Sequence, residues 1–259
     1  MGVKQIVEPP HLASDLKHLR LPSIGKHWQR LSEEANRKRQ SHGEYLADLA
    51  HLELTDRRER RVTRHINEAH FPSLKTIDGF DFAAQPGLNR DEVLALARCD
   101  FVEQHANVIL IGEVGTGKTH LASALGLSAC QRGFRVLFIT TSELCNQLSE
   151  SKAQDRLTRK LKSLARFDLV VLDELGYVPF DKFAADLLFG FIAKVYEQRS
   201  LIITTNLPFA RWNEVFLDAT AAAAVIDRIA HHATILQTEG ESYRLREAKA
   251  SKAKGRAEK

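Results

Sequence analysis

Eight consecutive residues combine three glycines, a lysine and a threonine at a spacing that suits phosphate binding. The run Gly112-Glu113-Val114-Gly115-Thr116-Gly117-Lys118-Thr119 matches the pattern G-x-x-x-x-G-K-[ST] at every fixed position. Glycines let the backbone curl so that several N–H groups point at phosphate oxygens, and a following helix N-terminus adds a positive dipole. Lys118 would reach the β- and γ-phosphates, and the Thr119 hydroxyl would coordinate Mg²⁺. We therefore expect residues 112–119, with the adjacent His120, to bind ATP.

An apolar run that ends in two acidic residues follows further along the chain, as Asp168-Leu169-Val170-Val171-Leu172-Asp173-Glu174. Such a run is typical of a buried strand whose end carries the second part of an NTPase site, the Walker B motif. Asp173 would hold Mg²⁺ through water, and Glu174 would orient the water that attacks the γ-phosphate. The alternative is a strand that simply ends in solvated charge. Its position after the glycine-rich motif favours the catalytic interpretation.

Two further polar residues are weaker candidates. Asn206 ends the run Leu201-Ile-Ile-Thr-Thr-Asn206 and could contact the γ-phosphate and the attacking water, although an asparagine before Leu-Pro is also common in an ordinary turn. Arg228 lies on an apolar helical stretch after Asp227, and its planar fork suits an arginine that neutralises transition-state charge. A surface ion pair within the helix is the alternative, and spacing alone favours it.

Five arginines lie within eight positions near the N-terminus: Arg57, Arg58, Arg60, Arg61 and Arg64. On a helix, Arg57, Arg60, Arg61 and Arg64 fall on one face, where they could follow DNA phosphates without reading sequence. The alternative is a solvated face whose arginines pair with nearby carboxylates. We favour duplex DNA because the segment belongs to a basic region. The run Arg37-Lys38-Arg39 is a second, weaker patch.

The histidines and cysteines do not predict a metal site. The three cysteines have no metal-binding or redox spacing, which fits a reducing cytoplasm. Seven histidines lie before residue 76, and His231 and His232 are adjacent, but no tetrahedral set with a cysteine or carboxylate is evident. The apolar runs are too short to span a membrane, and the first residues do not resemble a signal peptide. We expect a cytoplasmic protein.

Alternating patterns predict the elements that would position these residues. Short runs rich in β-branched residues alternate with longer amphipathic stretches. The short runs lie at 107–111, 135–140, 168–174, 201–206 and 233–238. The amphipathic stretches lie at 118–132, 141–165, 182–198 and 211–231. Buried parallel strands joined by helical crossovers give this pattern. The sequence also predicts a helix at residues 91–105. The chain is therefore predicted to belong to the α/β class, with a parallel sheet covered by helices on both sides.

The flanking segments differ from this core in composition. Residues 11–70 show helical periodicity and are predicted to form three or four short helices, with starts near Ser32 and at the capping box Ser41-x-x-Glu44. We therefore expect a helical domain at 1–70 and a linker at 71–90 that packs its phenylalanines on the next domain. The ATPase domain is expected at 91–246, and a basic, disordered tail at 247–259. The net charge is +4, and both ends are basic while the middle is acidic.

The order of these motifs resembles a known family. The chain contains, in this order, GEVGTGKTHLA, VVLDELGYVPF, IITTNLPFARW, DRIAHH and GESYR. It also contains LRLPSIGKHW near the start and FPSLKTIDGFDF in the expected linker. Together they are similar to the IstB family of ATPase helper proteins of bacterial insertion sequences, related to DnaC helicase loaders and the initiator DnaA. The resemblance covers about residues 12–246, nearly the whole chain.

This resemblance implies an AAA+ P-loop fold with a parallel five-stranded sheet in the order 5-1-4-3-2, after a small all-helical N-terminal domain. It implies that Asn206 is sensor 1, that Arg228 is an arginine finger acting on a neighbouring subunit, and that Arg244 could compensate for a reduced helical lid. It also implies ATP-dependent self-assembly on duplex DNA and cooperation with a separate transposase.

The sequence therefore predicts a Mg²⁺-dependent ATPase that assembles on duplex DNA and assists a transposase. A DnaC-like helicase loader is the nearest alternative, because it would share the core but use its N-terminal region to grip a helicase. A P-loop kinase and a module that holds ATP without turnover are further alternatives. Glu174 and Asn206 argue against the kinase, and the complete set of Lys118, Asp173 and Glu174 argues against the non-hydrolysing module.

Overall fold

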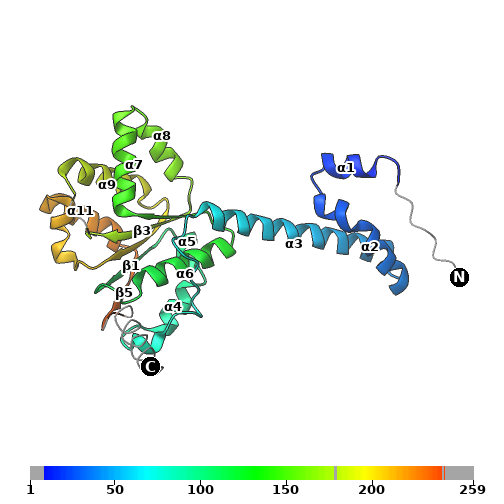
Figure 1. The fold of residues 1–259 in the computed structure, drawn as a ribbon, viewed down its shortest axis with the longest axis horizontal. Helices are drawn as coiled ribbons and strands as arrows, with labels where there is room; N and C mark the ends of the chain where they lie inside the picture. Colours follow the sequence, from blue (N-terminus) through cyan, green and yellow to red (C-terminus); the bar gives the residue numbers. More distant parts are fainter. Residues whose placement is uncertain (1–8, 178–179, 241, 243–259) are drawn as a thin grey trace, which may run out of the picture. The chain divides into compact units, whose positions relative to one another are not determined.

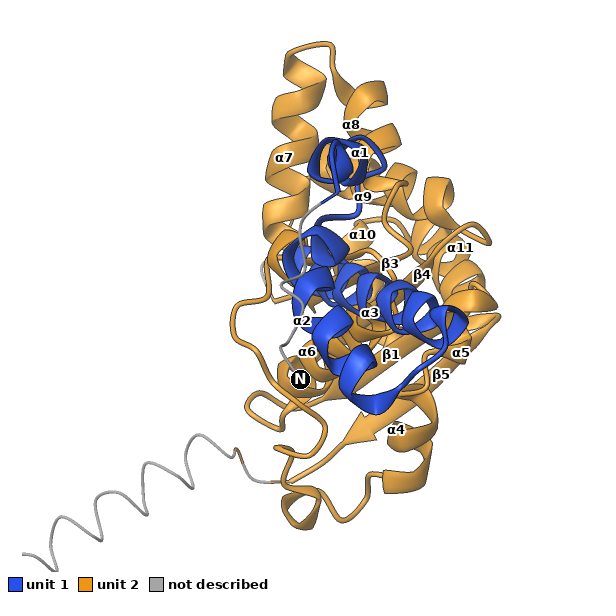
Figure 2. Cartoon of the chain, turned by 90° about the vertical axis from the view of Figure 1, so that its right-hand side faces the viewer, with its two compact units in different colours: residues 1–64 blue, residues 65–259 orange. Residues whose placement is uncertain are grey.

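The computed structural model describes residues 9–177, 180–240 and 242. The chain divides into two compact units, residues 1–64 and residues 65–259 (Figures 1 and 2). The division falls within the long helix α3, a few residues before the boundary expected at residue 70. The predicted tail at 247–259 and Arg244 lie outside the described residues. None of the described helices is long and apolar enough to cross a membrane.

The first unit is helical, with α1 at Leu12–His18, α2 at Pro22–Lys38 and most of α3, which spans His42–Glu68. The helix start predicted near Ser32 is wrong, because α2 runs through this position from Pro22, whose fixed φ suits the first helical turn. The capping box is confirmed. The Ser41 N–H donates to Glu44 Oε2 at 2.7 Å, and the Glu44 N–H donates to Ser41 Oγ at 3.3 Å.

The buried carboxylate of Glu53 joins α3 to the start of α2. Glu53 is only 3% exposed, and its Oε2 accepts from the N–H groups of Ser23 at 2.9 Å and Ile24 at 3.2 Å. Its Oε1 accepts from Arg57 at 3.1 Å and Arg60 at 3.3 Å. These bonds satisfy N–H groups in the first turn of α2, which have no partner within their own helix. The unit therefore depends on one acidic side chain that several donors surround.

The second unit is built on a parallel sheet that the described residues form in the order β2-β3-β4-β1-β5. This is the predicted order 5-1-4-3-2 read from the other edge, so the expected topology is confirmed. The strands are, in chain order, β1 Asn107–Gly112, β2 Val136–Thr140, β3 Leu169–Leu175, β4 Ser200–Thr205 and β5 Ala233–Thr238. Their carboxyl ends all meet at one edge, where the motif residues follow β1 and β4 and lie at the end of β3.

Alternating strand residues pack against two layers of helices (Figure 1). Ile109 and Val170 face a layer that contains α7 (Thr141–Ala153), α9 (Lys182–Val195), α10 (Asn213–Phe216) and α11 (Ala219–Ala230). Val108 and Val171 face a layer that contains α4 (Arg90–Leu96), α5 (Asp100–Glu103) and α6 (Lys118–Gln131). Burial on both faces explains the continuous apolar runs of these strands.

Two of the predicted helices are divided in the structure. The segment 91–105 forms α4 and α5, because Cys99 between them has a left-handed φ of 59° that ends the helical path. The segment 141–165 forms α7 and α8 (Leu157–Leu164), with Asp155 at a φ of 56° between them. Short 3₁₀ turns lie at Phe82–Ala84 and Phe209–Arg211. Single left-handed residues of types other than glycine leave no clear signal in the sequence.

The segment 71–90, which was expected to be a linker, lies within the second unit and packs its phenylalanines on the core of that unit. Phe80 is buried, and Phe71 and Phe82 pack against the same apolar cluster as α6. The Phe71 ring lies 6.0 Å from that of Phe138, and the Phe80 ring lies edge-on to His120 at 5.3 Å. This segment therefore forms part of the wall beside the glycine-rich loop.

Replacing Glu53 with glutamine tests the corner between α2 and α3. The change keeps the shape of the side chain but weakens four hydrogen bonds, so we expect a loss of about 1–3 kcal/mol of local stability. Hydrogen exchange over residues 12–38 should then accelerate by about one to two orders of magnitude. Glu59→Gln is the matched control, because Glu59 is an exposed residue of the same helix. Equal acceleration in both variants would show that the Glu53 contacts do not hold the corner.

Candidate nucleotide-binding site

The glycine-rich loop joins the end of β1 to the start of α6, as its motif predicts. Gly117 caps the helix at a left-handed φ of 96°, and a Cβ there would lie 2.7 Å from a ring carbon of Phe80. A Cβ on Gly112 would lie 2.1 Å from the carbonyl oxygen of Thr238. Both positions therefore require glycine, one for its backbone conformation and both for the close approach of a neighbour.

Internal hydrogen bonds set the shape of this loop. Lys118 Nζ donates to the carbonyl oxygens of Gly112 at 2.8 Å and Glu113 at 2.6 Å, which holds the ammonium against the loop. The buried Thr116 hydroxyl donates to the Glu113 carbonyl at 2.8 Å and bonds to the Thr238 hydroxyl at 2.7 Å. The Thr116 side chain thus ties the loop to the end of β5, while Val114 is exposed.

Asp173 lies at the centre of the predicted metal site. It is 4% exposed, and its carboxylate accepts from the Thr119 hydroxyl at 3.1 and 3.2 Å and from the Thr204 hydroxyl at 2.5 Å. The Thr141 hydroxyl donates to its backbone carbonyl at 2.9 Å. A carboxylate and a hydroxyl at a helix N-terminus are oxygen donors of the kind that Mg²⁺ prefers. The side chains present therefore fit the ion that the sequence predicts.

Glu174 adopts an unusual backbone conformation beside Asp173. Its φ is 62°, and the pairing of β3 with β4 shifts register between Leu172 and Leu175. A β-bulge of this kind redirects side chains, and bulges are frequent next to active sites. Here it leaves Asp173 buried while Glu174 is exposed. The left-handed conformation costs roughly 1–2 kcal/mol, and the bond from the Glu174 N–H to Thr204 Oγ1 at 2.9 Å stabilises it.

Thr204 is a positioning residue that the sequence did not single out. Its hydroxyl donates to Asp173 and accepts from the Glu174 N–H, so it fixes the two acidic residues relative to each other. The signal for it was the pair of threonines that ends an otherwise apolar strand, Leu201-Ile202-Ile203-Thr204-Thr205. A buried hydroxyl at such a position requires a partner. The strand order supplies one by placing β4 between β3 and β1.

Asn206 follows β4 directly and is exposed at the same edge of the sheet. The preceding Thr205 donates its hydroxyl to the Leu175 carbonyl at 2.8 Å and accepts from the Leu207 N–H at 3.0 Å. These bonds fix the turn that carries Asn206 next to the end of β3. The structure therefore brings Asn206 to the edge where Asp173, Glu174 and the glycine-rich loop lie.

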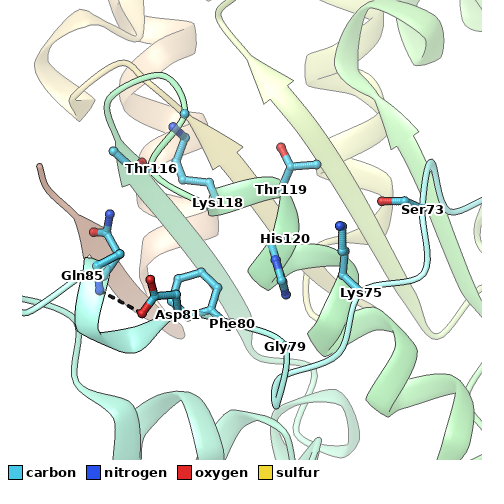
Figure 3. Close-up of a pocket in the computed structure, with 13 residues that line it drawn as sticks. Ser73, Lys75, Gly79, Phe80, Asp81, Gln85, Thr116, Lys118, Thr119 and His120 are labelled. Carbon is cyan, nitrogen blue, oxygen red and sulfur yellow. Dashed lines mark hydrogen bonds between the residues drawn. The ribbon is translucent and has the colours of Figure 1, made fainter. Parts of the chain in front are cut away.

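A pocket of about 430 Å³ lies beside this loop (Figure 3). One wall is formed by Gly115–His120, and the other by side chains of the segment 73–85. The residues of the second wall are Ser73, Lys75, Gly79, Phe80, Asp81, Ala84 and Gln85. His120 contacts the Thr76 carbonyl at 2.9 Å, and the Glu239 N–H donates to Gln85 at 3.1 Å. The pocket is large enough for a small organic ligand, and all of its second wall was predicted only as a linker.

Comparison with known proteins places these features in a family. The sequence profile of the IstB-like ATP binding protein family matches residues 14–251. The chain belongs to this family. It is 40% identical over 252 residues to an insertion sequence ATP-binding protein of Sinorhizobium fredii, covering 97% of this chain and 85% of that protein. It is also 40% identical over 232 residues to the insertion sequence IS21 ATP-binding protein of Pseudomonas aeruginosa, covering 90% of this chain and 88% of that one.

Solved structures show which fold this IstB-like chain shares. The crystal structure of the DnaC helicase loader matches with a TM-score of 0.55 at 22% identity, over 68% of this chain and 98% of that one. AMPPCP-bound DnaA from Aquifex aeolicus matches with a TM-score of 0.56 at 18% identity, over 70% of this chain and 56% of that one. The predicted AAA+ fold is therefore confirmed.

Arg228 lies at the opposite edge of the sheet from the glycine-rich loop. It belongs to the last turn of α11, shortly before β5 begins, whereas the loop follows the far end of β1. The pairing of Asn107 with Ala233 and of Gly112 with Thr238 shows that β1 and β5 run side by side for their whole length. At roughly 3.3 Å per residue the two edges are about 16 Å apart. The structure thus does not bring Arg228 to the loop of its own chain.

The Arg228 side chain packs on an aromatic ring. Its guanidinium carbon lies 5.2 Å from the centre of the Phe189 ring, and among the described residues its buried Nη1 has no hydrogen-bond partner. Contact with a ring face holds a guanidinium without using its donors. The ion pair within the helix, which the spacing favoured, is absent from the part of the chain that the structure describes.

The arginine stripe on α3 divides into two groups. Arg57 and Arg60 bind Glu53, and they also donate to the Arg20 carbonyl at 2.7 Å and the Ser23 hydroxyl at 3.0 Å. Part of their role is therefore structural. The remaining three are exposed and have no ion pair with the described residues. They are Arg58, Arg61 and Arg64.

Gly117→Ala tests whether the loop beside Phe80 binds nucleotide. The new Cβ would meet the Phe80 ring and would occupy a left-handed conformation that costs roughly 1–2 kcal/mol, so we expect ATP affinity to fall about tenfold or more. Titration with a fluorescent ATP analogue measures this. Gly133→Ala is the matched control, because Gly133 has a φ of 97° but nothing within 4 Å of the added Cβ. Unchanged affinity in the Gly117 variant would remove the loop from the nucleotide site.

Proposed function

We propose that this protein hydrolyses ATP with Mg²⁺, assembles on duplex DNA and assists a separate transposase in the movement of an insertion sequence. The observation that carries the hydrolytic part is the arrangement of Thr119, Asp173 and Glu174 at the carboxyl edge of the sheet, beside the glycine-rich loop. The names of the relatives, insertion sequence ATP-binding proteins at 40% identity over most of the chain, support the biological setting.

The chemistry follows from the positions of these residues. The loop N–H groups and Lys118 would hold the phosphates, and Thr119 and Asp173 would hold Mg²⁺, which neutralises charge on the β- and γ-oxygens. Glu174 would orient a water molecule for in-line attack on the γ-phosphorus and accept its proton. The bond from phosphorus to the β-bridging oxygen breaks, and ADP and phosphate leave. The bulge at Glu174 supports this role, because it turns this carboxylate to solvent while Asp173 stays buried.

Self-assembly would complete the site. Arg228 lies near the edge of the sheet opposite its own loop, and the two edges are about 16 Å apart, so it would act on the nucleotide of a neighbouring subunit. An arginine supplied in this way stabilises the charge that develops in the transition state. In the single chain Arg228 packs on Phe189 and its Nη1 is buried, so the side chain would have to turn outward to make that contact. ATP would then favour assembly, and hydrolysis would weaken it.

DNA would bind through phosphate contacts from the first unit. Arg58, Arg61 and Arg64 are exposed on α3 and follow one another along it, and Arg57 and Arg60 are also about half exposed, at 47% and 53% of their side chains. Such contacts position a protein on the duplex without reading its sequence. We favour this function over a helicase loader, because the similarity to DnaC is at 22% identity, whereas the insertion-sequence relatives reach 40%.

The direct test measures ATP turnover and particle size together, with and without duplex DNA. We expect DNA and ATP to produce large particles with raised turnover, and we expect addition of a transposase from the same insertion sequence to raise strand transfer. Turnover without any response to DNA, together with binding to a replicative helicase, would favour the loader instead.

Mixing two inactive variants tests whether Arg228 acts between subunits. Arg228→Ala lacks the arginine but keeps Glu174, and Glu174→Gln lacks the carboxylate but keeps Arg228. Each alone should lose turnover, on the order of 10³-fold for the arginine variant. An equal mixture should recover roughly a quarter of the parent rate. In random head-to-tail assembly, about one interface in four then joins a subunit that has Arg228 to a subunit that has Glu174. Arg211→Ala, which removes an exposed arginine elsewhere, is the control. No recovery on mixing would contradict action between subunits.

The salt dependence of DNA binding tests the exposed arginines. Combined replacement of Arg58, Arg61 and Arg64 with alanine should reduce the slope of log K against log salt by up to about 0.9 for each lost phosphate contact. Fluorescence anisotropy with a labelled duplex measures the slope. In the control variant, alanine replaces Arg98, Arg132 and Arg211, which are exposed in the other unit, so the same charge is removed. We expect this variant to leave the slope unchanged. Equal slopes in the two variants would remove α3 from the DNA interface.

A further inference from the structure

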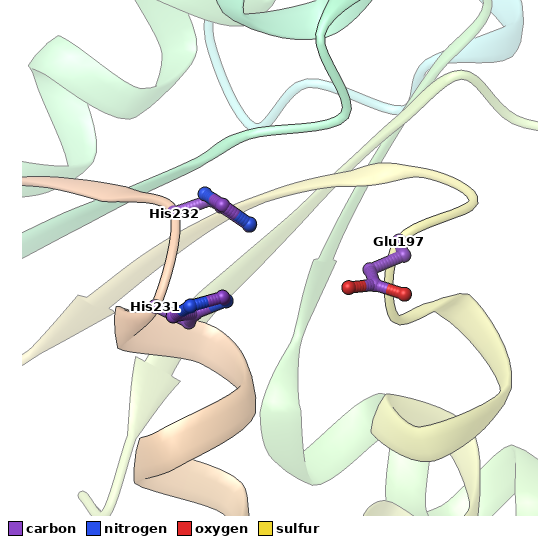
Figure 4. A group of neighbouring side chains, drawn as sticks. All are labelled: Glu197, His231 and His232. Atoms are coloured by element: carbon purple, nitrogen blue, oxygen red, sulfur yellow. The ribbon is translucent and has the colours of Figure 1, made fainter.

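Three side chains of types that can bind metal ions meet at the edge of the sheet that carries Arg228. Glu197, His231 and His232 each offer a ligand atom, and these atoms all lie within 4.8 Å of one another. Figure 4 shows the Glu197 carboxylate turned toward the two imidazole rings, whose centres are 4.1 Å apart. The sequence showed only the adjacent histidines. The fold adds the carboxylate, because the turn after α9 lies next to the junction of α11 and β5.

We propose that Glu197, His231 and His232 bind a divalent transition-metal ion, with Zn²⁺ as the species that suits them best. Two imidazoles and one carboxylate are a common protein ligand set for Zn²⁺, and they leave a fourth position for water or another donor. This inference does not depend on the proposed ATPase function. The Mg²⁺ site predicted at Asp173 lies at the other edge of the sheet and offers only oxygen donors.

The separations allow the ligands to close on one ion. Bonds of about 2.0–2.1 Å in a tetrahedron place ligand atoms roughly 3.3 Å apart, so gaps of up to 4.8 Å close with movements of about 1 Å. All three side chains are exposed, and side-chain rotations in exposed residues are fast and inexpensive. No change of the backbone is therefore required.

The backbone on both sides of the site is already held in place. The N–H groups of Gln198 and Arg199 donate to the Val195 carbonyl at 3.0 Å each, which fixes the turn that presents Glu197. The His231 N–H continues the α11 ladder to Asp227 at 3.1 Å, and the His232 carbonyl accepts from Asn107 at 2.8 Å. A preorganised backbone with mobile side chains is a favourable basis for metal binding.

The cluster connects two elements that are far apart in the sequence. A bound ion would join the turn after α9 to the end of α11, the helix that carries Arg228 and packs on Phe189 of α9.

Calorimetric titration with zinc chloride tests the site. The full chain is prepared without a histidine tag, stripped with a chelator and measured without nucleotide, Mg²⁺ or DNA, so that failure of the ATPase proposal cannot affect the result. We expect one binding event that Glu197→Gln weakens at least about tenfold and that His231→Ala/His232→Ala abolishes. Titration with Co²⁺ adds a spectrum whose intensity reports the coordination number.

Three controls make the result decisive. His42→Ala/His51→Ala removes two exposed histidines of α3 and should leave the event unchanged. Asp173→Asn should also leave it unchanged, because the predicted Mg²⁺ site is elsewhere. Circular dichroism of each variant confirms folding. Absence of binding in the parent, or equal binding in the parent and the His231→Ala/His232→Ala variant, would overturn the proposal.

Discussion

The buried carboxylate of Asp173 is the constraint around which the candidate site is organised. A carboxyl group with 4% exposure is stable only when hydrogen-bond donors surround it, and here one donor comes from α6 and another from β4. The same Thr204 hydroxyl that supplies the second donor also accepts from Glu174. One hydrogen-bonded group therefore fixes the start of α6, the end of β3 and the end of β4 relative to one another. Glu174 keeps its left-handed backbone conformation because these hydrogen bonds hold the residues on both sides of it in place.

The sheet and the loop could be predicted from the sequence because their signals are local. A buried parallel strand is an unbroken apolar run, and Gly112–Thr119 forms a continuous motif between a strand and a helix. The capping box at Ser41 and Glu44 was also visible, because its two partners are three residues apart. The helix start predicted at Ser32 is wrong, although it also came from a local signal. Pro22 begins that helix ten residues earlier, and nothing at Ser32 interrupts it.

Features that depend on distant parts of the chain could not be predicted. Glu53 looked like one of several acidic residues on α3, yet its partners lie 29 and 30 positions away in α2. Glu197 meets the histidine pair only because of the order in which the elements pack. The segment 73–85 carries no sign in its composition that it lines a pocket. In each case the individual residue types are common, and only the fold gives them a shared location.

The opposite placement of the glycine-rich loop and Arg228 also determines the symmetry of an assembly. If the arginine of one subunit reaches the nucleotide of the next, the two contacting surfaces are different, and the contact is heterologous. Such a contact cannot close a two-fold dimer and instead repeats in one direction, as a ring or a helical filament. In a filament the two ends are not equivalent, because one terminal subunit has a nucleotide site without a donated arginine. Hydrolysis would then have a polarity along the DNA, with the terminal site slower than those inside.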